Sequence, residues 1–351
     1  MNAFLNAHIL QPAPLANLNR DDTGAPKDLV YGGVTRARWS SQSLKRAARV
    51  AFEGQSNADR TSRSKIVADD IADRAIVALR DAGETVDDAL EKELRTAARK
   101  RVNSLVTTKK PEDGSETLIW LAEHESQQIM EQLVAGTDAD CVQPQTASLS
   151  IAGFGRMFAA AKPQQTEAAV QVAHAFSVNA ASIDVDYFTA VDDLAAIGAG
   201  HLDVAAFTSG VFYRYFNIDR RQLLANWSAA GEADATQRLE AFLGCLFTAL
   251  PTGKRNATAP HTPPVYIMLT TSNQGASLAH AFEAPIPAKT EGYLPDAISR
   301  LEDWATRLEL YYPSMTGSTA IMNMTADGPP SLTFDSMVSA AARWILDGTP
   351  L

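Results

Sequence analysis

The residues best suited to chemistry form a run of cations near the N-terminus. Six lysines and arginines lie between positions 27 and 49, with Asp28 as the one carboxylate among them: Lys27, Arg36, Arg38, Lys45, Arg46 and Arg49. Like charges three or four positions apart on a helix repel by roughly 0.2–0.5 kcal/mol. An anion lying along them would offset that repulsion, so the run suggests a phosphate-binding surface. A solvated helix face is the competing interpretation, because many charge runs only keep a surface hydrated.

The second half of this run predicts a helix from about residue 41 to 53. Ser40 or Ser41 can cap its first turn, since a serine hydroxyl accepts a hydrogen bond from an amide two or three residues on. A capped N-terminus also offers free N–H donors and a partial positive charge, which suit a phosphate. Helical spacing predicts two stripes: Leu44, Ala47, Ala48 and Ala51 or Phe52 on the buried side, and Gln42, Lys45 and Arg49 beside them.

The composition is that of an ordinary globular protein, with 351 residues of which 46% are apolar and 21% are charged. A chain of this length predicts one elaborated domain or two. Its 41 carboxylates outnumber its 31 lysines and arginines, which gives a net charge of −10. Such an acidic chain is unsuited to coating nucleic acid indiscriminately, but it is compatible with a local basic groove.

The sequence gives no sign of export, of a membrane span or of a cysteine-based site. The N-terminus has no basic n-region, and no stretch approaches the roughly 18 apolar residues of a membrane helix. Cys141 and Cys245 lie far apart and lack metal-ligand spacing. We therefore expect a cytoplasmic protein with no membrane partner, no zinc site and no disulfide framework.

The order of the predicted elements is that of an α+β fold. A strand at 4–10 and a polar loop at 17–33 precede the helix at 41–53, and a linker at 54–63 leads into an all-helical insertion at 64–135. Later patterns predict strands at 148–154, 170–178, 209–218 and 265–270, and helices at 220–227, 235–250, 277–283, 294–311 and 333–346. A βαββαβ-type sheet with helices on one face accommodates this order, and that sheet is also the frame of RNA-recognition modules.

The sequence lacks the common catalytic and cofactor motifs. It contains no G-x-G-x-x-G, Walker loop, H-E-x-x-H or G-x-S-x-G. Two histidines on predicted strands, His8 and His174, are expected to be satisfied core residues. Asp21 and Asp22 could bind a metal or polarise a water, but adjacent carboxylates beside Arg20 also suit a turn with ion pairs. We therefore predict no catalytic residue, no metal and no cofactor.

Several residues outside the cation run have side chains suited to nucleic acid. Tyr187 and Phe188 lie in a polar stretch without core periodicity, where rings can stack on bases unless they tuck into a core. Met157 follows a predicted strand and could lie against a base or sugar with Arg156 on a phosphate, although core filling is the simpler interpretation of Met157. The remaining candidates are two basic pairs in polar loops: Lys109–Lys110 and Lys254–Arg255.

Several motifs of this chain stand in the order found in CasC, the backbone subunit of the type I-E CRISPR surveillance complex Cascade. The motifs are Leu18–Asp22, Lys27–Asp28, Gly32–Gly33, Arg38–Ala47, Gly155–Met157, Phe188–Leu194 and Ser209–Tyr215. The similarity is specific from Asn2 to about Ile218 and looser toward the C-terminus. On these motifs the chain resembles the CasC family.

The resemblance implies a hand-like protein. Its palm, of the RNA-recognition-motif (ferredoxin-like) type, would comprise residues 1–60 and 140–351. A helical fingers insertion would occupy residues 61–139, and a β-hairpin thumb would occupy residues 180–208 within the palm. Copies of such a subunit polymerise along the spacer of a CRISPR RNA, and each thumb folds over the next RNA segment. The implied partners are CRISPR RNA, the target DNA strand paired to it, further copies of the chain and other Cascade subunits.

The resemblance also implies roles for individual residues. Met157 would wedge beside displaced bases, and the thumb, with Tyr187, Phe188 and Thr189, would interrupt guide–target pairing at regular intervals. Lys109–Lys110 would help to guide target DNA. The residues expected to hold the RNA backbone are Arg20, Lys27, Ser40, Gln42, Lys45, Arg46, Arg49, Arg156, Lys254 and Arg255.

We therefore predict a non-catalytic, guide-RNA-binding backbone subunit of a type I-E-like Cascade complex. Phosphate contacts fix register without reading sequence, which suits a subunit that accepts any spacer. Specificity then comes from guide–target pairing. Two alternatives stay open. Type III backbone proteins resemble this fold and cleave RNA with a loop aspartate, for which Asp21 or Asp22 would be the candidate, and a protein scaffold would contact RNA only incidentally.

Overall fold

The computed structural model describes residues 2–56, 59–107, 110, 112, 115–191, 199–328 and 332–351, with the backbone alone for 189–191 and 199–202. The chain forms two compact units. Unit 1 comprises residues 1–51, 171–219 and 243–351, and unit 2 comprises residues 52–170 and 220–242. Each unit is therefore built from segments that are far apart in the sequence.

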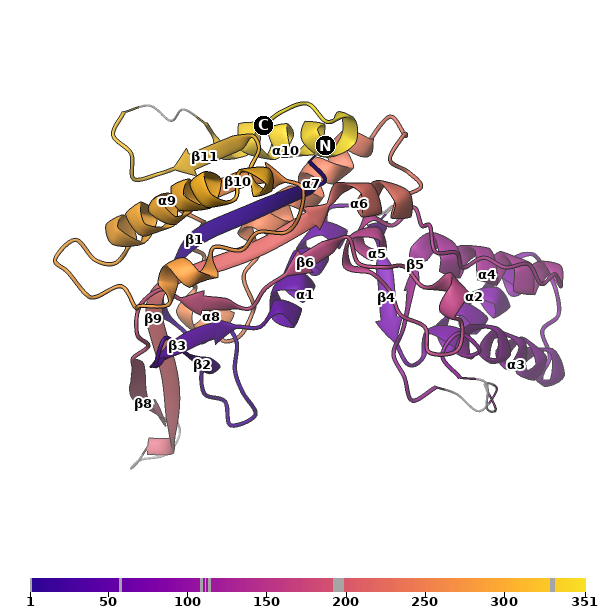
Figure 1. Cartoon of the computed structure of the whole chain (residues 1–351). Helices are drawn as coiled ribbons and strands as arrows, with labels where there is room; N and C mark the ends of the chain where they lie inside the picture. Colours follow the sequence, from indigo (N-terminus) through magenta and orange to yellow (C-terminus); the bar gives the residue numbers. More distant parts are fainter. Residues whose placement is uncertain are drawn as a thin grey trace. The chain divides into compact units, whose positions relative to one another are not determined.

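Unit 1 is organised around an antiparallel sheet that has nine strands within the described residues. They are β1 (Phe4–Ala16), β2 (Asp28–Tyr31), β3 (Val34–Trp39), β6 (Val170–Val172), β7 (Ala175–Ser177), β8 (Ile183–Val191), β9 (Ala199–Asp219), β10 (Tyr266–Ser272) and β11 (Thr319–Asn323). The order is β11-β10-β1-β9-β7-β3-β2, and β6 and β8 also pair with β9 (Figure 1). The strands predicted near 4–10, 209–218 and 265–270 are confirmed, and the one at 170–178 is broken into β6 and β7.

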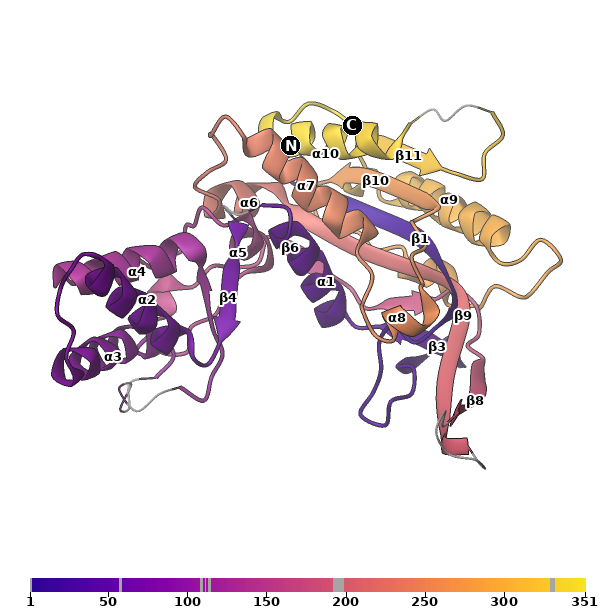
Figure 2. The ribbon, with the colours of Figure 1, turned by 180° about the vertical axis from the view of Figure 1, so that it is seen from behind.

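Helices cover both faces of this sheet. On β9, Tyr213 packs in one cluster with Leu301 of helix α9 (Leu294–Tyr311). Its neighbour Phe212 packs in another with Leu44 of helix α1 (Ser41–Glu53). Adjacent strand residues face opposite sides, and Figures 1 and 2 show α9 on one side and α1 on the other. The prediction of helices on one face is wrong, and the unbroken burial of residues 5–11 of β1 reflects this double cover.

A buried arginine fastens a helix end to the sheet of unit 1. Arg214 of β9 donates hydrogen bonds to the carbonyls of Leu246 and Phe247 at 2.8 and 2.7 Å. These carbonyls belong to the last turn of helix α7 (Ala235–Thr248), where a positive charge is favourable. Burial lowers the pKa of Arg214 to about 10, so the guanidinium stays charged at neutral pH. Unit 1 also contains α8 (Arg255–Thr258), α10 (Phe334–Asp347) and the 3₁₀ turns η4 (Ala279–Phe282) and η5 (Pro313–Met315).

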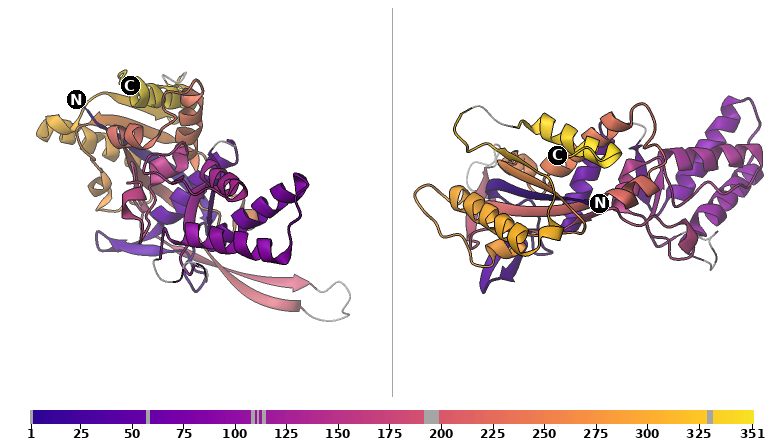
Figure 3. Two further views of the ribbon diagram at one scale, coloured as in Figure 1. Left: turned by 90° about the vertical axis from the view of Figure 1, so that its right-hand side faces the viewer. Right: turned by 45° about the horizontal axis from the view of Figure 1, so that its top comes forward.

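Strands β8 and β9 form a hairpin that extends beyond the sheet (Figure 3). Strand β9 pairs with β1 from Thr208 to Asp219 and with β8 from Ala199 to Thr208. One continuous strand therefore belongs to the sheet and to the hairpin. The residue pattern alone predicted only a polar stretch around Tyr187 and Phe188, whereas the family resemblance implied a β-hairpin at 180–208.

Unit 2 is largely helical. It contains α2 (Val67–Asp81), α3 (Asp88–Asn103), α4 (Glu123–Ala135), α5 (Leu149–Phe154), α6 (Arg220–Asn226), the 3₁₀ turn η3 (Lys162–Gln164), the first part of α7, and strands β4 (Thr61–Ser64) and β5 (Ile119–Ala122). The apolar stripes of α2, α3 and α4 meet in one core through Ile71, Val102 and Ile129. The predicted insertion at 64–135 is not all-helical, because β5 lies within it and pairs with β4.

The strand predicted at 148–154 is wrong. This segment is helix α5, and the Ser148 side chain accepts a hydrogen bond from the Ile151 amide at its start. Residues 149–153 are all buried. A segment without an exposed face has no periodicity that distinguishes a strand from a short helix.

The chain as a whole has a mixed α+β fold with an antiparallel sheet. The palm, fingers and thumb, with the boundaries given above, stay a prediction. Among the described residues, no helix combines the length and the hydrophobicity that crossing a membrane requires.

Candidate nucleic-acid interface

The first turn of α1 is tied to the loop that precedes β2. The Ser40 hydroxyl accepts a hydrogen bond from the Ser43 amide at 3.3 Å, which confirms the predicted cap. Asn19 Oδ1 accepts from the Ser40 amide at 2.7 Å and from the Ser43 hydroxyl at 3.3 Å. The Lys27 amide donates to the Asn19 carbonyl at 2.9 Å. Ser40 is buried, so its main part is to shape the helix start rather than to present a donor.

Within this loop, Asp21 holds a turn. Its carboxylate accepts hydrogen bonds from the Thr23 amide at 2.9 Å, the Thr23 hydroxyl at 2.8 Å and the Ala25 amide at 3.0 Å. These bonds, led by the one from the hydroxyl, lower the pKa of Asp21. Asp21 is thus a turn residue, as one of the two interpretations of the sequence proposed. Among the residues that the structure describes, no three His, Cys, Asp or Glu side chains are grouped to hold a metal.

Helix α1 divides its side chains much as the sequence predicted. Leu44 is buried over the stacked rings of Trp39 and Phe212, whose centroids are 3.8 Å apart. Gln42 and Arg46 are exposed, whereas Lys45 and Arg49 are half-buried. Lys45 lines a small pocket with Val172 and Tyr215, and burial lowers its pKa. Its aliphatic stem therefore packs on the sheet.

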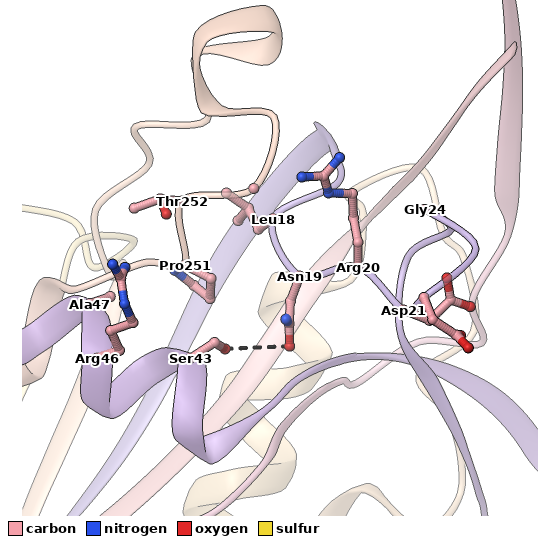
Figure 4. Close-up of a pocket in the computed structure, with 12 residues that line it drawn as sticks. Leu18, Asn19, Arg20, Asp21, Gly24, Ser43, Arg46, Ala47, Pro251 and Thr252 are labelled. Atoms are coloured by element: carbon pink, nitrogen blue, oxygen red, sulfur yellow. Dashed lines mark hydrogen bonds between the residues drawn. The ribbon is translucent and has the colours of Figure 1, made fainter. Parts of the chain in front are cut away.

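A cleft of about 470 Å³ lies between the loop after β1, helix α1 and the segment after α7 (Figure 4). Arg20 and Arg46 both line it, together with Ser43, Asp21 and Thr252. Figure 4 shows the two guanidinium groups pointing away from the bonded pair Asn19 and Ser43. Two guanidiniums on one cleft suit an anion with several oxygens, because each offers directed N–H donors.

A neighbouring groove of about 400 Å³ shares Arg46 with this cleft and adds Arg255 and His261. Arg255 and His261 have nitrogens 3.5 Å apart. Lys254 immediately precedes α8 and has a left-handed φ of 44°, and its ammonium lies 5.4 Å from the centre of the Phe207 ring. Unit 1 therefore brings both residues of this basic pair to the same region as Arg46.

His174 also lies at the start of α1, where the sequence did not predict it. It is exposed in the break between β6 and β7, so the expectation of a buried core histidine is wrong. Its Nδ1 accepts a hydrogen bond from the Ser41 amide at 2.9 Å. Burial of part of the ring, followed by the positive charges of Arg38 and Lys27, lowers its pKa. The sequence analysis predicted one strand over 170–178, and that prediction missed the break between β6 and β7 in which His174 lies.

The hairpin presents two unlike faces. Tyr187 and Phe188 are 69% and 45% exposed, so the alternative that they fill a core is wrong. Cross-strand pairing sets Tyr187 opposite Val204 and Phe188 opposite Asp203, so the two rings lie on opposite faces. The Tyr187 face also carries the exposed Ile183 and Val185. The Phe188 face carries Asp184, Asp186 and Asp203, and the side chain of Thr189 lies outside the described residues.

Comparison with known proteins places the chain in a family. The family model described as "CT1975-like protein" matches residues 5–339. The chain belongs to the CT1975-like family. The predicted membership of the CasC family is thereby confirmed.

Solved structures similar to this CasC-family chain belong to CRISPR complexes. A chain of a "CRISPR RNA-guided surveillance complex, pre-nicking" is 29% identical with a TM-score of 0.80, and the match covers 97% of this chain and 100% of that one. A chain of a "CRISPR RNA-guided surveillance complex" is 26% identical with a TM-score of 0.62, over 97% of this chain and 98% of that one. No curated protein matches at a significant level.

Arg156, which was expected to bind RNA in this CasC-family protein, is not accessible to a ligand. Arg156 is buried in unit 2, where its Nη1 lies 2.6 Å from Glu125 Oε2, and the side chains are 1% and 2% exposed. Its Nη2 donates to the Gln143 carbonyl at 3.0 Å. A guanidinium already neutralised and enclosed cannot reach a phosphate, so the predicted phosphate contact of Arg156 is wrong.

The other unit 2 candidates differ from Arg156. Met157 is 79% exposed, so the alternative that it fills a core is wrong, and its role as a wedge stays a prediction. Lys110 is exposed, and its contact with DNA also stays a prediction. Lys109 lies outside the described residues.

Proposed function

We propose that this chain is the guide-RNA-binding backbone subunit of a type I-E CRISPR RNA-guided surveillance complex, Cascade. The observation that carries the proposal is the full-length likeness to a chain of such a complex, at a TM-score of 0.80 and 29% identity, combined with the family membership. Its partners would be CRISPR RNA, the DNA strand paired to it, further copies of the chain and other subunits.

The surface at the start of α1 supports a phosphate-binding role. In a chain with net charge −10, the cleft beside α1 carries Arg20 and Arg46, and Lys27 and Arg38 lie near His174 at the start of this helix. Such contacts attract a nucleic-acid backbone and fix its register without reading bases. This property suits a subunit that must accept any spacer, because base pairing between guide and target then supplies the specificity.

The hand-like division belongs to the same proposal. The palm would be built on the sheet of unit 1, the fingers on the helices within 61–139, and the thumb on the hairpin within 180–208. Support for a thumb comes from the length of β9, which continues beyond its pairing with β1. Met157 would act as the wedge, and its exposed, unbranched side chain is suited to contact with a base.

We propose that the subunit is non-catalytic. The loop aspartate of the nuclease alternative, Asp21, is committed to three hydrogen bonds from its own turn. These bonds all go to Oδ1, and a metal held by Oδ2 would need further ligands beside it. Among the described residues, neither Asp21 nor the exposed Asp22 belongs to a group of three His, Cys, Asp or Glu side chains that could hold a metal.

The first test is co-expression with a repeat–spacer RNA and the other complex subunits, followed by purification and sequencing of the retained RNA. We expect the wild-type chain to retain CRISPR RNA of uniform length. The Lys45→Glu/Arg49→Glu double variant should lose it, because two reversed charges repel the phosphates. Arg307→Glu/Arg343→Glu, a double reversal at exposed positions of α9 and α10, is the control for added negative charge and should retain RNA. Because Lys45 and Arg49 are half-buried, the first double variant must also keep the melting temperature of the wild type. Random RNA fragments, or retention indifferent to the first double variant, would refute the proposal and favour the scaffold.

A further inference from the structure

His174 has no part in the function proposed above, although it lies beside the cations that carry it. Its ring makes one hydrogen bond within the described residues, as the acceptor for the Ser41 amide at 2.9 Å. The side chain is exposed. The ring is therefore held at the start of α1 while part of it remains open to a ligand.

The bond to Ser41 fixes the tautomer of the ring. A neutral imidazole has one nitrogen that accepts and one that carries a proton. Because Nδ1 accepts from the amide, the proton must be on Nε2. The backbone thus orients an N–H donor that has no acceptor within the described part of the chain.

The charges around this donor are positive. Arg38 and Lys27 both act on the ring, and no described carboxylate contributes to its pKa, which is lowered chiefly by burial. Arg38 is itself fixed, since its Nε donates to the Asp28 carbonyl at 3.0 Å and its amide donates to the Lys27 carbonyl at 2.8 Å. A neutral donor and two cations from three separate segments therefore lie close together at the start of α1.

We propose that His174 is a further guide-binding residue, which donates from Nε2–H to a phosphate oxygen of the RNA that Lys27 and Arg38 attract. The inference rests on the proposed function and adds a named contact to it. Lys27 attracts the phosphate from a flexible stem, whereas the histidine ring is locked and supplies a single direction. His174 thereby helps to position one phosphate along the guide relative to the helix.

Three substitutions separate RNA binding from helix capping. In His174→Asn, the amide oxygen can take the place of Nδ1 and accept from Ser41, but nothing reaches the position of Nε2. In His174→Gln, the longer amide can reach the Nε2 position, but the acceptor for Ser41 is lost. His174→Ala removes both groups. The full-length protein is titrated into a fluorescein-labelled repeat–spacer RNA, with anisotropy as the readout, at several salt concentrations.

We expect His174→Asn to keep the melting temperature of the wild type and to bind RNA about tenfold more weakly, as the loss of one hydrogen bond to a charged group predicts. The slope of log affinity against log salt should stay the same, because a neutral donor releases no counterion. His174→Gln should have a lower melting temperature than the wild type. It should bind RNA more tightly than His174→Ala does. Lys27→Ala should reduce the salt slope, which identifies the cationic contribution.

Wild-type affinity of His174→Asn would show that the ring is only a helix cap, and would overturn the proposal. The same titration with a 2′-deoxy strand identifies the acceptor. An equal loss on both strands supports a phosphate oxygen, whereas a loss confined to RNA would assign the 2′-hydroxyl instead. If the wild type and the Lys45→Glu/Arg49→Glu variant bind RNA equally weakly, the proposed function itself fails. If the Lys45→Glu/Arg49→Glu variant binds RNA weakly but His174→Asn binds it like the wild type, only the inference about His174 fails.

Discussion

Arg156 and Glu125 form a pair in unit 2 with almost no solvent contact, at 2.6 Å between Nη1 and Oε2. Removing one partner leaves the other charge buried without compensation, which typically costs about 3–5 kcal/mol. We therefore predict that Arg156→Met destabilises the protein by about that amount. Thermal unfolding of the full chain measures it, and a large fall in the melting temperature is expected.

The control is an exposed pair in the same unit. Lys65 and Glu116 are 2.8 Å apart with side chains 50% and 97% exposed, so Lys65→Met should change stability by less than about 1 kcal/mol. If Arg156→Met unfolds like the wild type yet loses RNA, the burial argument is mistaken and a phosphate contact for Arg156 must be restored.

Asp21 gives a prediction that depends on pH. The hydrogen bonds from Thr23 and Ala25 lower its pKa from the ordinary value of 3.8. A carboxyl with a lowered folded pKa stabilises its turn above the unfolded pKa, and that contribution is lost as the pH falls below about 3.8. The Thr23 and Ala25 amides should therefore stay protected from hydrogen exchange from pH 7 down to pH ~5, and lose protection in strong acid.

Asp21→Asn tests the turn against the nuclease alternative. Asparagine makes the same kind of turn, so this variant should keep the amide protection and the RNA affinity, whereas Asp21→Ala should lose the protection. Neither the wild type nor Asp21→Asn should cleave RNA when a divalent cation is added. Metal-dependent cleavage by the wild type that Asp21→Asn abolishes would reinstate the nuclease.

At the level of single residues, the sequence predicted side-chain chemistry better than side-chain placement. Arg36 and Arg38 belong to one cation run, yet they are two apart on β3 and meet opposite environments. Arg36 is fully buried and donates to four carbonyls, of Ser177, Val178, Phe282 and Glu283, at 2.8–3.0 Å. Arg38 stays at the surface beside Lys27. Partners far apart in the sequence decide which cation is buried and which reaches the surface, and a local sequence pattern does not contain them.

Among the elements, the β8–β9 hairpin invites a test of its two faces. The face with Tyr187 is apolar, and the face with Phe188 carries Asp184, Asp186 and Asp203. Phosphates avoid the acidic face, so bases should meet the Tyr187 face. Loss of one base–aromatic stack is worth about 1–3 kcal/mol. We predict that Tyr187→Ala weakens RNA binding by about tenfold or more and Phe188→Ala by much less, measured by RNA anisotropy.

The matched control for this comparison is Val204→Thr, opposite Tyr187, which removes no ring and should bind RNA normally. If Phe188→Ala has the larger effect, then the acidic face is the one that meets the guide. That result would also require a cation to shield the three aspartates.

At the same scale, the sequence predicted elements with a clear outer and inner side. The amphipathic helices α1 and α9 were predicted within a residue or two. The errors fall on segments without such contrast. Helix α5 is buried over residues 149–153, and the β6–β7 segment turns at His174 although its apolar alternation continues. When a segment is buried on all sides, or when a strand breaks within a periodic stretch, the hydrophobic pattern does not indicate the secondary structure.

For the whole molecule, the charge distribution matters more than its sum. A chain with net charge −10 repels nucleic acid at long range, so we expect RNA binding to depend on the local surface at α1 and to weaken with salt. Repulsion elsewhere disfavours loose binding to unrelated RNA. The mixed fold and an inserted helical segment could be predicted, but the inclusion of residues 140–170 and 220–242 in unit 2 could not, because it depends on contacts between segments far apart in the sequence.

Because β9 belongs to both the sheet and the hairpin, the number of residues in the hairpin determines which side chains lie on which of its faces. Residues 201–208 of β9 pair with β8 in regular register, and residues 208–219 pair with β1 with one register shift near Thr208. Side chains alternate between faces along a strand, so inserting or deleting one residue in each strand at the base of the hairpin, near Ile183 and Thr208, would exchange the apolar and acidic faces. A change of two residues in each strand would lengthen or shorten the hairpin and leave Tyr187 facing as it does now. Hairpin length can therefore vary between related proteins, but we expect it to vary in even steps.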